Sequence, residues 1–417
     1  MVESLRTMFA YPRQDAAAGI VVFLVAVPLC LGIAVASGVP PVSGLVAGVV
    51  GGILVPFLSR SPLSVTGPAA GLVSIVVLET EKLGGFERFL AATVAAGGIQ
   101  FLLGLLRCGR FARLVPSSVI KGMLAAIGIV IVLKQLPVAV GAPGGLGSIS
   151  AGAAAGPALI AAVTLAVLLG WRFTPLARLA ALPAALAAVV LAAALAALFR
   201  GIPSLALAPE HFVRVPLGGF GSLMDALPRP DFSVLAVMDG WVVAGTVAAV
   251  AGIETLLSVQ AVDRLDPLKR TSPPDRELLA QGVANAASGW MGGLPVTAVI
   301  VRSGANVAAG GRERMSTLVH GVLLLVSVVF AGAALNLIPL ACLAAILLQV
   351  GLGLARPALF RAQWRLGGEQ FVPFAITIAG VLAFDLLKGV LAGIAVGIAF
   401  AQVMPASGDR AEADDSH

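Results

Sequence analysis

The sequence predicts an all-α polytopic membrane protein, and two observations lead to this prediction. Of the 417 residues, 59% are hydrophobic and 12% are charged, which is about half the charged share of an average soluble protein. The apolar residues also occur in runs of roughly 20, the length that a helix needs to cross the hydrocarbon core. Lipid can solvate so much apolar surface, whereas a globular core cannot bury it. The composition therefore excludes a soluble enzyme, a disordered chain and a secreted disulfide-bonded scaffold.

Fourteen apolar segments follow one another along the chain, in two sets of seven. Two of them are too short to cross alone and follow stretches broken by Gly and Pro; they cover 68–79 and 297–308, third and tenth in order. The full-length segments are predicted at 16–37, 41–58, 86–106, 117–136, 153–170, 182–199, 234–258, 276–291, 315–334, 339–354, 370–386 and 387–404. Seven is an odd number, so the second set should have the opposite orientation. We expect a 7+7 inverted repeat, as in many secondary transporters.

The predicted organisation has five parts. A cytoplasmic N-terminus over 1–15 precedes the first repeat at 16–200, an extracytoplasmic connection covers 201–233, the second repeat covers 234–404, and a short cytoplasmic tail covers 405–417. Placing both termini in the cytoplasm puts 18 Lys and Arg residues inside and 7 outside, as the positive-inside rule requires. This placement explains the net charge of +6 without a nucleic-acid partner.

A carboxylate and a hydroxyl lie in the eighth segment. Glu254 is surrounded by Ala, Val and Ile, and Ser258 follows one turn later on the same helix face. Ionisable side chains inside a span are costly and usually functional. The pair could bind Na⁺, or Glu254 could carry a proton. The alternative is that Glu254 lies near the helix end and pairs with a cytoplasmic arginine.

Arg302 lies inside the short tenth segment. A guanidinium at this depth could attract an anion toward a transport site. The alternatives are that its side chain reaches the interface or pairs with Glu254.

The two interrupted segments are predicted to contribute their backbone to an anion site. A half-helix that begins in mid-membrane directs free N–H groups and the positive end of its dipole toward the cavity. Small side chains at these positions would let an ion approach. The residues at the two starts are Gly67, Pro68, Ala69 and Ala70 in the first segment, and Thr297 and Ala298 in the second. The alternative is that Gly and Pro only bend the helices for packing.

Several stretches resemble the SulP family of inorganic anion transporters, over about residues 10–404. The third segment carries SVTGPAAG at 64–71 and the eighth carries IETLLS at 253–258. The remaining matches are at 27–41, 116–122, 285, 289, 292–295 and 302–303. The resemblance implies a core domain of segments 1–4 and 8–11, a gate domain of segments 5–7 and 12–14, and an anion site between segments 3 and 10. We also expect a homodimer in a bacterial inner membrane.

Three departures from the family pattern bear on function. Many members have Gln after the proline of the first helix, where this chain has Leu29. Members usually continue into a cytoplasmic STAS domain, for which 405–417 is too short. Sodium-coupled members use an acid and a hydroxyl in helix 8, which Glu254 and Ser258 match, and a threonine in helix 10, where this chain has Ile300 or a neighbour. Sodium is therefore the weaker candidate.

The sequence thus predicts a secondary active transporter of small inorganic anions, with bicarbonate and sulfate as the leading substrates. The expected mechanism is elevator-type alternating access with H⁺ or Na⁺ coupling or anion exchange. The alternatives are a passive anion channel, a nucleobase or dicarboxylate carrier on the same fold, and a membrane scaffold without flux. No nucleotide-binding loop or nucleophile–base pattern is present, so neither an ATP-driven pump nor an enzyme is expected. No cofactor is expected beyond a coupling ion.

Overall fold

The computed structural model describes residues 7–110, 116–142, 147, 149–174, 183–216, 219–384 and 386–403. The predicted tail over 405–417 lies outside the described residues. Most of the described chain is helical. Six described helices are long and apolar enough to cross a membrane by length and composition, and shorter apolar helices accompany them. Each predicted segment contains one helix, but the number of crossings and the inverted repeat stay predictions.

The helices of the first half begin close to the predicted positions. They are α2 (Pro12–Ala36), α3 (Pro41–Leu58), α4 (Val73–Leu83), α5 (Phe86–Leu105), α6 (Ser117–Ala139), α8 (Ala155–Gly170) and α9 (Ala184–Phe199). Prolines at the first positions favour several of these starts, because the ring fixes φ and the missing N–H needs no partner there.

The second half has a corresponding series. It comprises α11 (Met238–Leu265), α12 (Pro274–Trp290), α13 (Ile300–Ala308), α14 (Met315–Phe330), α16 (Leu340–Leu354), α18 (Gly368–Ala383) and α19 (Leu386–Val403). Four short helices connect longer ones: α7 (Ile149–Gly152), α10 (Gly219–Ala226), α15 (Gly332–Leu335) and α17 (Pro357–Arg365).

The two interrupted stretches depart from the all-α prediction. Each forms a short β-strand, β1 (Thr66–Pro68) and β2 (Val296–Ala298), and the strands pair antiparallel with Gly67 opposite Thr297. Helical structure resumes only at η1 (Ala70–Leu72) and α4 after β1, and at α13 after β2. Extended backbone at membrane depth must find hydrogen-bond partners inside the protein. Pairing the two broken stretches supplies part of them.

Polar side chains of α12 supply further partners. Asn285 accepts from the Val296 N–H at 2.7 Å and donates to the Val296 carbonyl at 3.0 Å. Gln281 donates to the Thr66 hydroxyl at 2.8 Å. These amides are fully buried, so α12 is a polar-faced helix whose side chains hold both strands in place.

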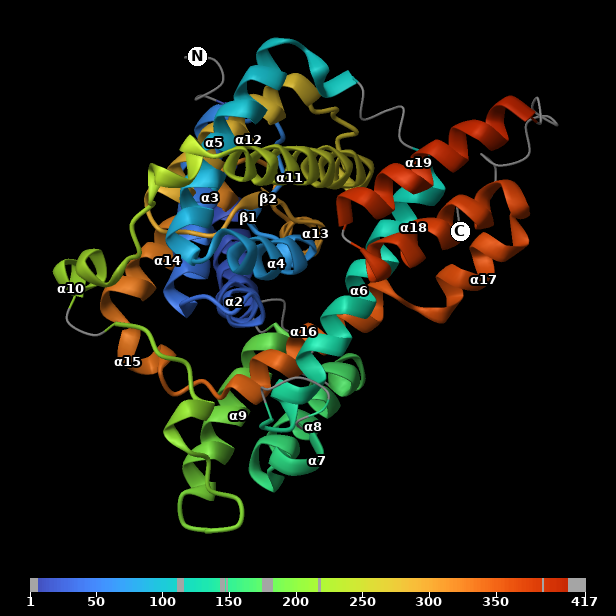
Figure 1. Ribbon diagram of the computed structural model, residues 1–417. Coiled ribbons are helices and arrows are strands. Elements are labelled where there is room, and N and C mark those ends of the chain that lie inside the picture. The colour runs from blue at the N-terminus through green and yellow to red at the C-terminus, as the bar shows by residue number, and fades with distance from the viewer. Residues whose placement is uncertain are drawn as a thin grey trace.

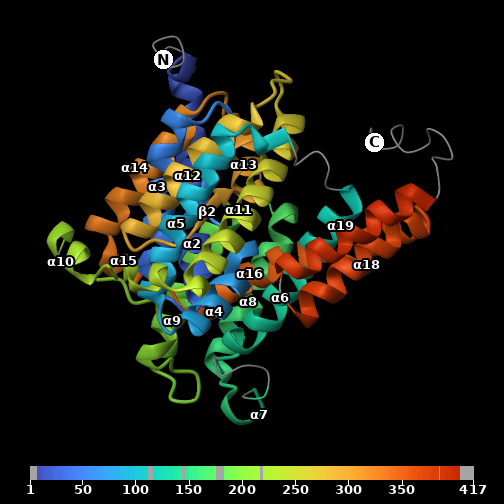
Figure 2. The ribbon, with the colours of Figure 1, turned by 45° about the horizontal axis from the view of Figure 1, so that its top comes forward.

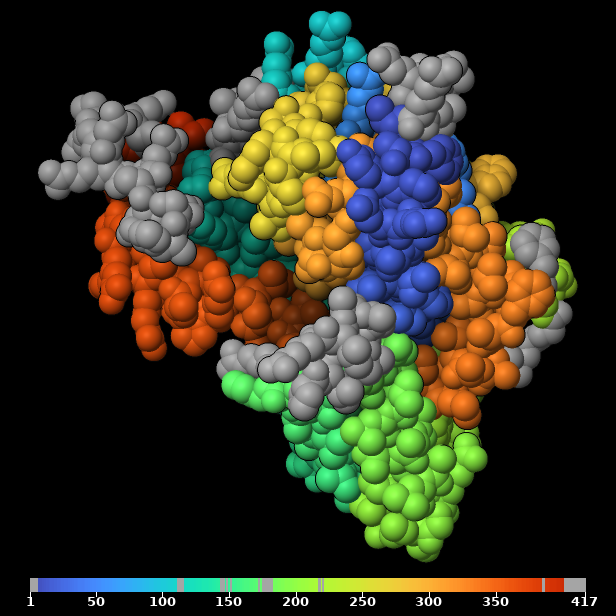
Figure 3. Space-filling view, turned by 180° about the vertical axis from the view of Figure 1, so that it is seen from behind, coloured from blue at the N-terminus to red at the C-terminus, as the bar shows by residue number. Residues whose placement is uncertain are grey.

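The helices pack in two groups. The strand bundle consists of α2–α5 and α11–α14, which surround β1 and β2; the second bundle consists of α6, α8, α9, α16, α18 and α19. In Figures 1 and 2, α18 and α19 lie on the side of the molecule away from α3 and α14. Seen from behind, the blue helix α2 lies between α13 and α14 in orange, above the green α9 region (Figure 3).

Glycines allow the closest helix crossings in both bundles. A Cβ on Gly282 of α12 would lie 2.5 Å from the Phe101 backbone nitrogen of α5. A Cβ on Gly128 of α6 would lie 2.5 Å from the Gly351 carbonyl oxygen of α16. Small residues let helix backbones approach in membranes, where the hydrophobic effect between helices is weak.

Candidate functional site

Two half-helices begin at opposite ends of the antiparallel pair of β1 and β2, which we call the strand crossing. Ala69 is buried between β1 and η1, and Ala70 opens η1. On the other chain segment, Val299 follows β2 and α13 begins at Ile300. The first N–H groups of a helix have no partner within the helix, and they mark its positive end. The half-helices therefore begin two to three residues later than the sequence predicted, but both still begin at the crossing.

Arg302 lies in the first turn of α13 and is fully buried. Its guanidinium lies against Gly67, where any Cβ would overlap Nη1, and its Nη2 donates to the Pro68 carbonyl at 3.5 Å. Nε and Nη1 have no hydrogen-bond partner among the described residues. A buried cation with two unused hydrogen-bond donors next to β1 would attract an anion electrostatically.

Glu254 of α11 lies against the first half-helix. A Cβ on Gly71 would lie 2.8 Å from Glu254 Oε2, so only glycine leaves room for the carboxyl group. Oε2 is buried and has no hydrogen-bond partner in the described part of the chain. Ser258 is buried one turn later in α11.

The pairing of Glu254 with an arginine is not seen. Among the ion pairs of the described residues, none includes Glu254 or Arg302. Arg302 is also not an interfacial side chain, because it is fully buried. Neither group is neutralised by an ion pair with a described residue.

Thr297 and Ala298 are fully buried in β2. The Ala298 N–H donates to the Thr255 hydroxyl at 3.3 Å, so it is engaged in this conformation. Thr255 directly follows Glu254 in the IETLLS stretch, and sequence reasoning overlooked it because the neighbouring acid explained the motif. Its hydroxyl connects α11 to β2.

A narrow crevice borders the first half-helix. It is lined by Pro68, Ala69 and Leu72 on one side and by Leu294 and Pro295 on the other. The crevice has no room for a water molecule. The passage toward Ala69 from this side is therefore closed in this conformation.

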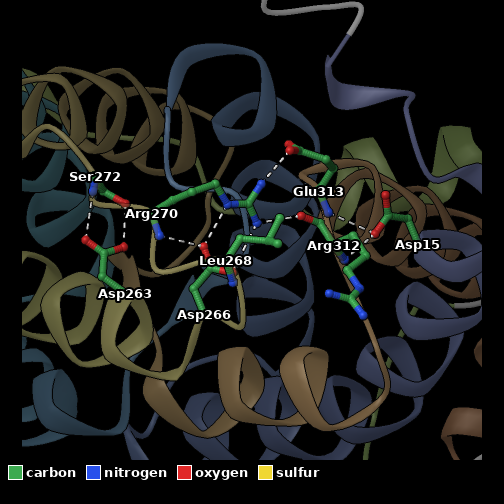
Figure 4. A network of polar contacts seen from close by, with 8 residues as sticks. All are labelled: Asp15, Asp263, Asp266, Leu268, Arg270, Ser272, Arg312 and Glu313. Atoms are coloured by element: carbon green, nitrogen blue, oxygen red, sulfur yellow. Dashed lines mark hydrogen bonds and ion pairs between the residues drawn. The ribbon is translucent and has the colours of Figure 1, made fainter.

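A charged network lies away from the strands, in the turns that follow α11 and α13 (Figure 4). Arg270 contacts Asp266 at 2.7 Å and Glu313 at 2.6 Å. Asp15 of α2 accepts from the Arg312 and Glu313 N–H groups at 2.7 and 3.0 Å. Burial would raise the pKa of Asp266, but hydrogen bonds from Arg270 and from backbone N–H groups outweigh it and hold that pKa below its usual range. The network fastens the turns after α11 and α13 to each other and to the beginning of α2.

The family of this fold follows from comparison with known proteins. A model of the sulfate permease family matches residues 13–377. The chain belongs to this family. Its members are transporters and not enzymes, so the chain is a multi-pass integral membrane protein of an anion transporter family, as the resemblance implied.

Two named relatives and one solved structure illustrate the similarity. The bicarbonate transporter BicA of Picosynechococcus is 27% identical over 410 residues, which are 94% of this chain and 70% of the relative. Sulfate transporter 4.1, chloroplastic, of Arabidopsis thaliana is 29% identical over 421 residues, covering 94% and 58%. The solved transmembrane domain of a cyanobacterium bicarbonate transporter BicA superposes with a TM-score of 0.78 at 21% identity, covering 94% of this chain and 98% of that one. This likeness shows the shared fold.

Proposed function

We propose that the chain is a secondary active transporter of a small inorganic oxyanion, with bicarbonate and sulfate as the substrates to test first. The single observation that carries this proposal is the antiparallel pairing of the two strands that lead into the half-helices, with the buried guanidinium of Arg302, which has two unused donors, lying against Gly67. The names of the relatives support the two substrates. We further propose a bacterial inner-membrane location, cytoplasmic termini and a homodimer.

The anion would be held mainly by backbone. The N–H groups at Ala69, Ala70 and the first turn of α13 would contribute the positive ends of the two half-helices, from the two ends of the short strand pair. The Arg302 guanidinium would add positive charge beside β1, where its Nη2 donates to the Pro68 carbonyl. Because the Ala298 N–H is taken by Thr255, an anion contacting β2 would have to displace that hydroxyl.

Glu254 is the proposed coupling group. Its free Oε2 lies against Gly71, within the same half-helix that would hold the anion, so a bound cation and the anion would stabilise each other. Ser258 would complete a Na⁺ site, while a proton needs Glu254 alone. Moving H⁺ with bicarbonate equals moving CO₂ and water, so a bicarbonate carrier should use Na⁺ or exchange.

Uptake by proteoliposomes tests the proposal. Radiolabelled bicarbonate, sulfate and fumarate are supplied with an imposed Na⁺ or pH gradient, each separately. We expect one inorganic anion to accumulate above its equilibrium level. Flux that only dissipates gradients would favour the passive channel, uptake of fumarate alone would favour the dicarboxylate carrier, and the absence of any flux would contradict the proposal.

Glu254→Gln separates coupling from binding. Glutamine keeps the size of the side chain but cannot carry a charge or a titrating proton. We expect gradient-driven accumulation to be lost while anion counterflow persists. The matched control is Glu210→Gln, at an exposed acid of the connection before α10. Wild-type accumulation by Glu254→Gln would show that the carboxylate is structural.

Cysteine labelling tests the orientation. A cysteine in place of Ser222, in α10, should react with an impermeant reagent added outside intact cells. A cysteine in place of Ser272, between α11 and α12, should react only after the membrane is opened. The reverse pattern would place both termini outside.

A further inference from the structure

An open cavity of about 370 Å³ lies well away from the strand crossing. It is formed by the connection that follows α9 and by the turn between α15 and α16. Its lining residues include Arg200, Leu207, Pro209, Phe212, Arg214 and Asn336. The predicted topology places both chain segments on the extracytoplasmic side.

The two segments are fastened to each other by specific hydrogen bonds. The Val213 N–H donates to the Ile338 carbonyl at 3.0 Å. The Asn336 amide accepts from the Val215 N–H at 2.6 Å and donates to the Val215 carbonyl at 3.0 Å. In Figure 1 the yellow-green chain before α10 runs beside the orange segment between α15 and α16. The walls of the cavity are therefore built by ordered backbone.

The charged side chains that line the cavity are all positive. Arg200 and Arg214 both line it and are exposed, and its lining includes no Asp or Glu. Neither arginine takes part in an ion pair with any described residue. A guanidinium offers a fork of donors that matches an oxyanion in two-point contact. Two guanidinium groups that make no ion pair with a described residue line one open cavity, and together they favour a negatively charged oxygen ligand.

We propose that this cavity is a second anion site, which binds the oxyanion group of a free inorganic ion or of a lipid phosphate between Arg200 and Arg214. The site is separate from the strand crossing, and it stands whether or not an anion is transported there.

The second anion site borders the two chain segments that connect the bundles. The connection after α9 leads from the second bundle to α11, and the turn after α15 leads from α14 to α16. Both covalent links that border the cavity therefore join the two bundles. An anion held between Arg200 and Arg214, with Asn336 clamping the opposite wall, stabilises one arrangement of these links and so biases the relative position of the bundles.

Protection of arginines from phenylglyoxal tests the site without measuring transport. The full chain is reconstituted in neutral phosphatidylcholine vesicles, treated with and without inorganic sulfate, and digested for peptide mass spectrometry. At a sulfate concentration ten times the dissociation constant, mass action predicts roughly tenfold slower modification of Arg200 and Arg214. Arg229, an exposed arginine outside the cavity, is the internal control and should react at an unchanged rate.

A second arm distinguishes the source of the oxyanion. Vesicles containing phosphatidylglycerol, without sulfate, should slow the modification of Arg200 and Arg214 relative to Arg229 only if the phosphate of an anionic lipid occupies the cavity, since the phosphatidylcholine reference carries its phosphate beside a choline cation. In Arg200→Gln, protection of Arg214 should fall, because both share one anion. Equal modification rates in every condition, or protection that Arg229 shares, would overturn the proposal.

Discussion

The strand bundle and the second bundle differ in the polar side chains that they bury between helices. In the strand bundle, buried polar side chains such as Glu277, Gln281, Asn285 and Arg302 fill the space between helices. Glu277, for example, accepts from the Ser59 hydroxyl at 2.7 Å. Helices cross through glycine in both bundles, as α5 and α12 do in the strand bundle and as α6 and α16, or α18 and α19, do in the described part of the second bundle. Few polar side chains are buried there.

The difference in buried polar side chains follows from the backbone conformation in the two bundles. Only the strand bundle contains β1 and β2, and extended backbone in a membrane interior must be satisfied by protein groups. Side chains of α12 do this, and the result is a geometrically determined site. The second bundle has regular helices that satisfy their own backbone, so small-residue packing is enough. The strand bundle therefore combines close helix packing with buried polar side chains, whereas few polar side chains are buried among the described helices of the second bundle.

Asn285→Ala should have the largest effect, because it removes three hydrogen bonds, two with Val296 of β2 and one with Gln100 of α5. Val296 loses both of its partners and Gln100 loses one, and each unsatisfied buried group costs about 1–3 kcal/mol. We expect a large fall in melting temperature, measured by scanning fluorimetry in detergent. The control is Gln135→Ala in α6, a buried amide of the second bundle that should cost less. Equal losses would refute the contrast between the bundles.

Gly67→Ala should impair the site more than the fold. The added methyl overlaps the Arg302 guanidinium and must displace it, at a cost of about 1–3 kcal/mol for overpacking. Transport rate and anion affinity should both fall. Gly304→Ala, in α13 with open space around it, is the matched control and should behave as wild type. Normal affinity in Gly67→Ala would show that the position of Arg302 does not matter to the anion.

Gly128→Ala should impair the fold more than the site. A Cβ there meets the Gly351 carbonyl, so α6 and α16 must separate, again at about 1–3 kcal/mol. Thermal stability and transport rate should fall while anion affinity is kept, because the strands are untouched. Gly353→Ala, with nothing within 4 Å, provides the comparison. A change in equilibrium anion binding would mean that the bundles are not independent.

The smallest expected effect concerns the turns of the strand bundle. The pKa of Asp266 is held below its usual range, so the paired carboxylate contributes stability above its unfolded pKa, near 3.9. This contribution is lost as the pH falls through the lower folded value. Asp266→Asn should therefore reduce stability at pH 7 by about 1 kcal/mol or less and flatten the acid side of the pH–stability curve. An unchanged curve would show that the Arg270 pair is energetically neutral.

Hydropathy predicted the helices well because each span is a local property of about 20 residues. The Gly/Pro breaks also located both half-helices. The pairing of β1 with β2 could not be predicted, since it joins residues far apart in sequence and its strands are only three residues long. The direction of Arg302 depends on the space that Gly67 leaves, and the role of Thr255 depends on where β2 lies. Neither has a local sequence signal.

The pairing of β1 with β2 also sets an order for biogenesis. Thr66 meets its partner Ala298 only after most of the chain has left the ribosome. Until then the third segment holds backbone groups that neither water nor protein satisfies, which is costly inside a bilayer. The break near Gly67 can therefore find its partners only once α12 and β2 have been made.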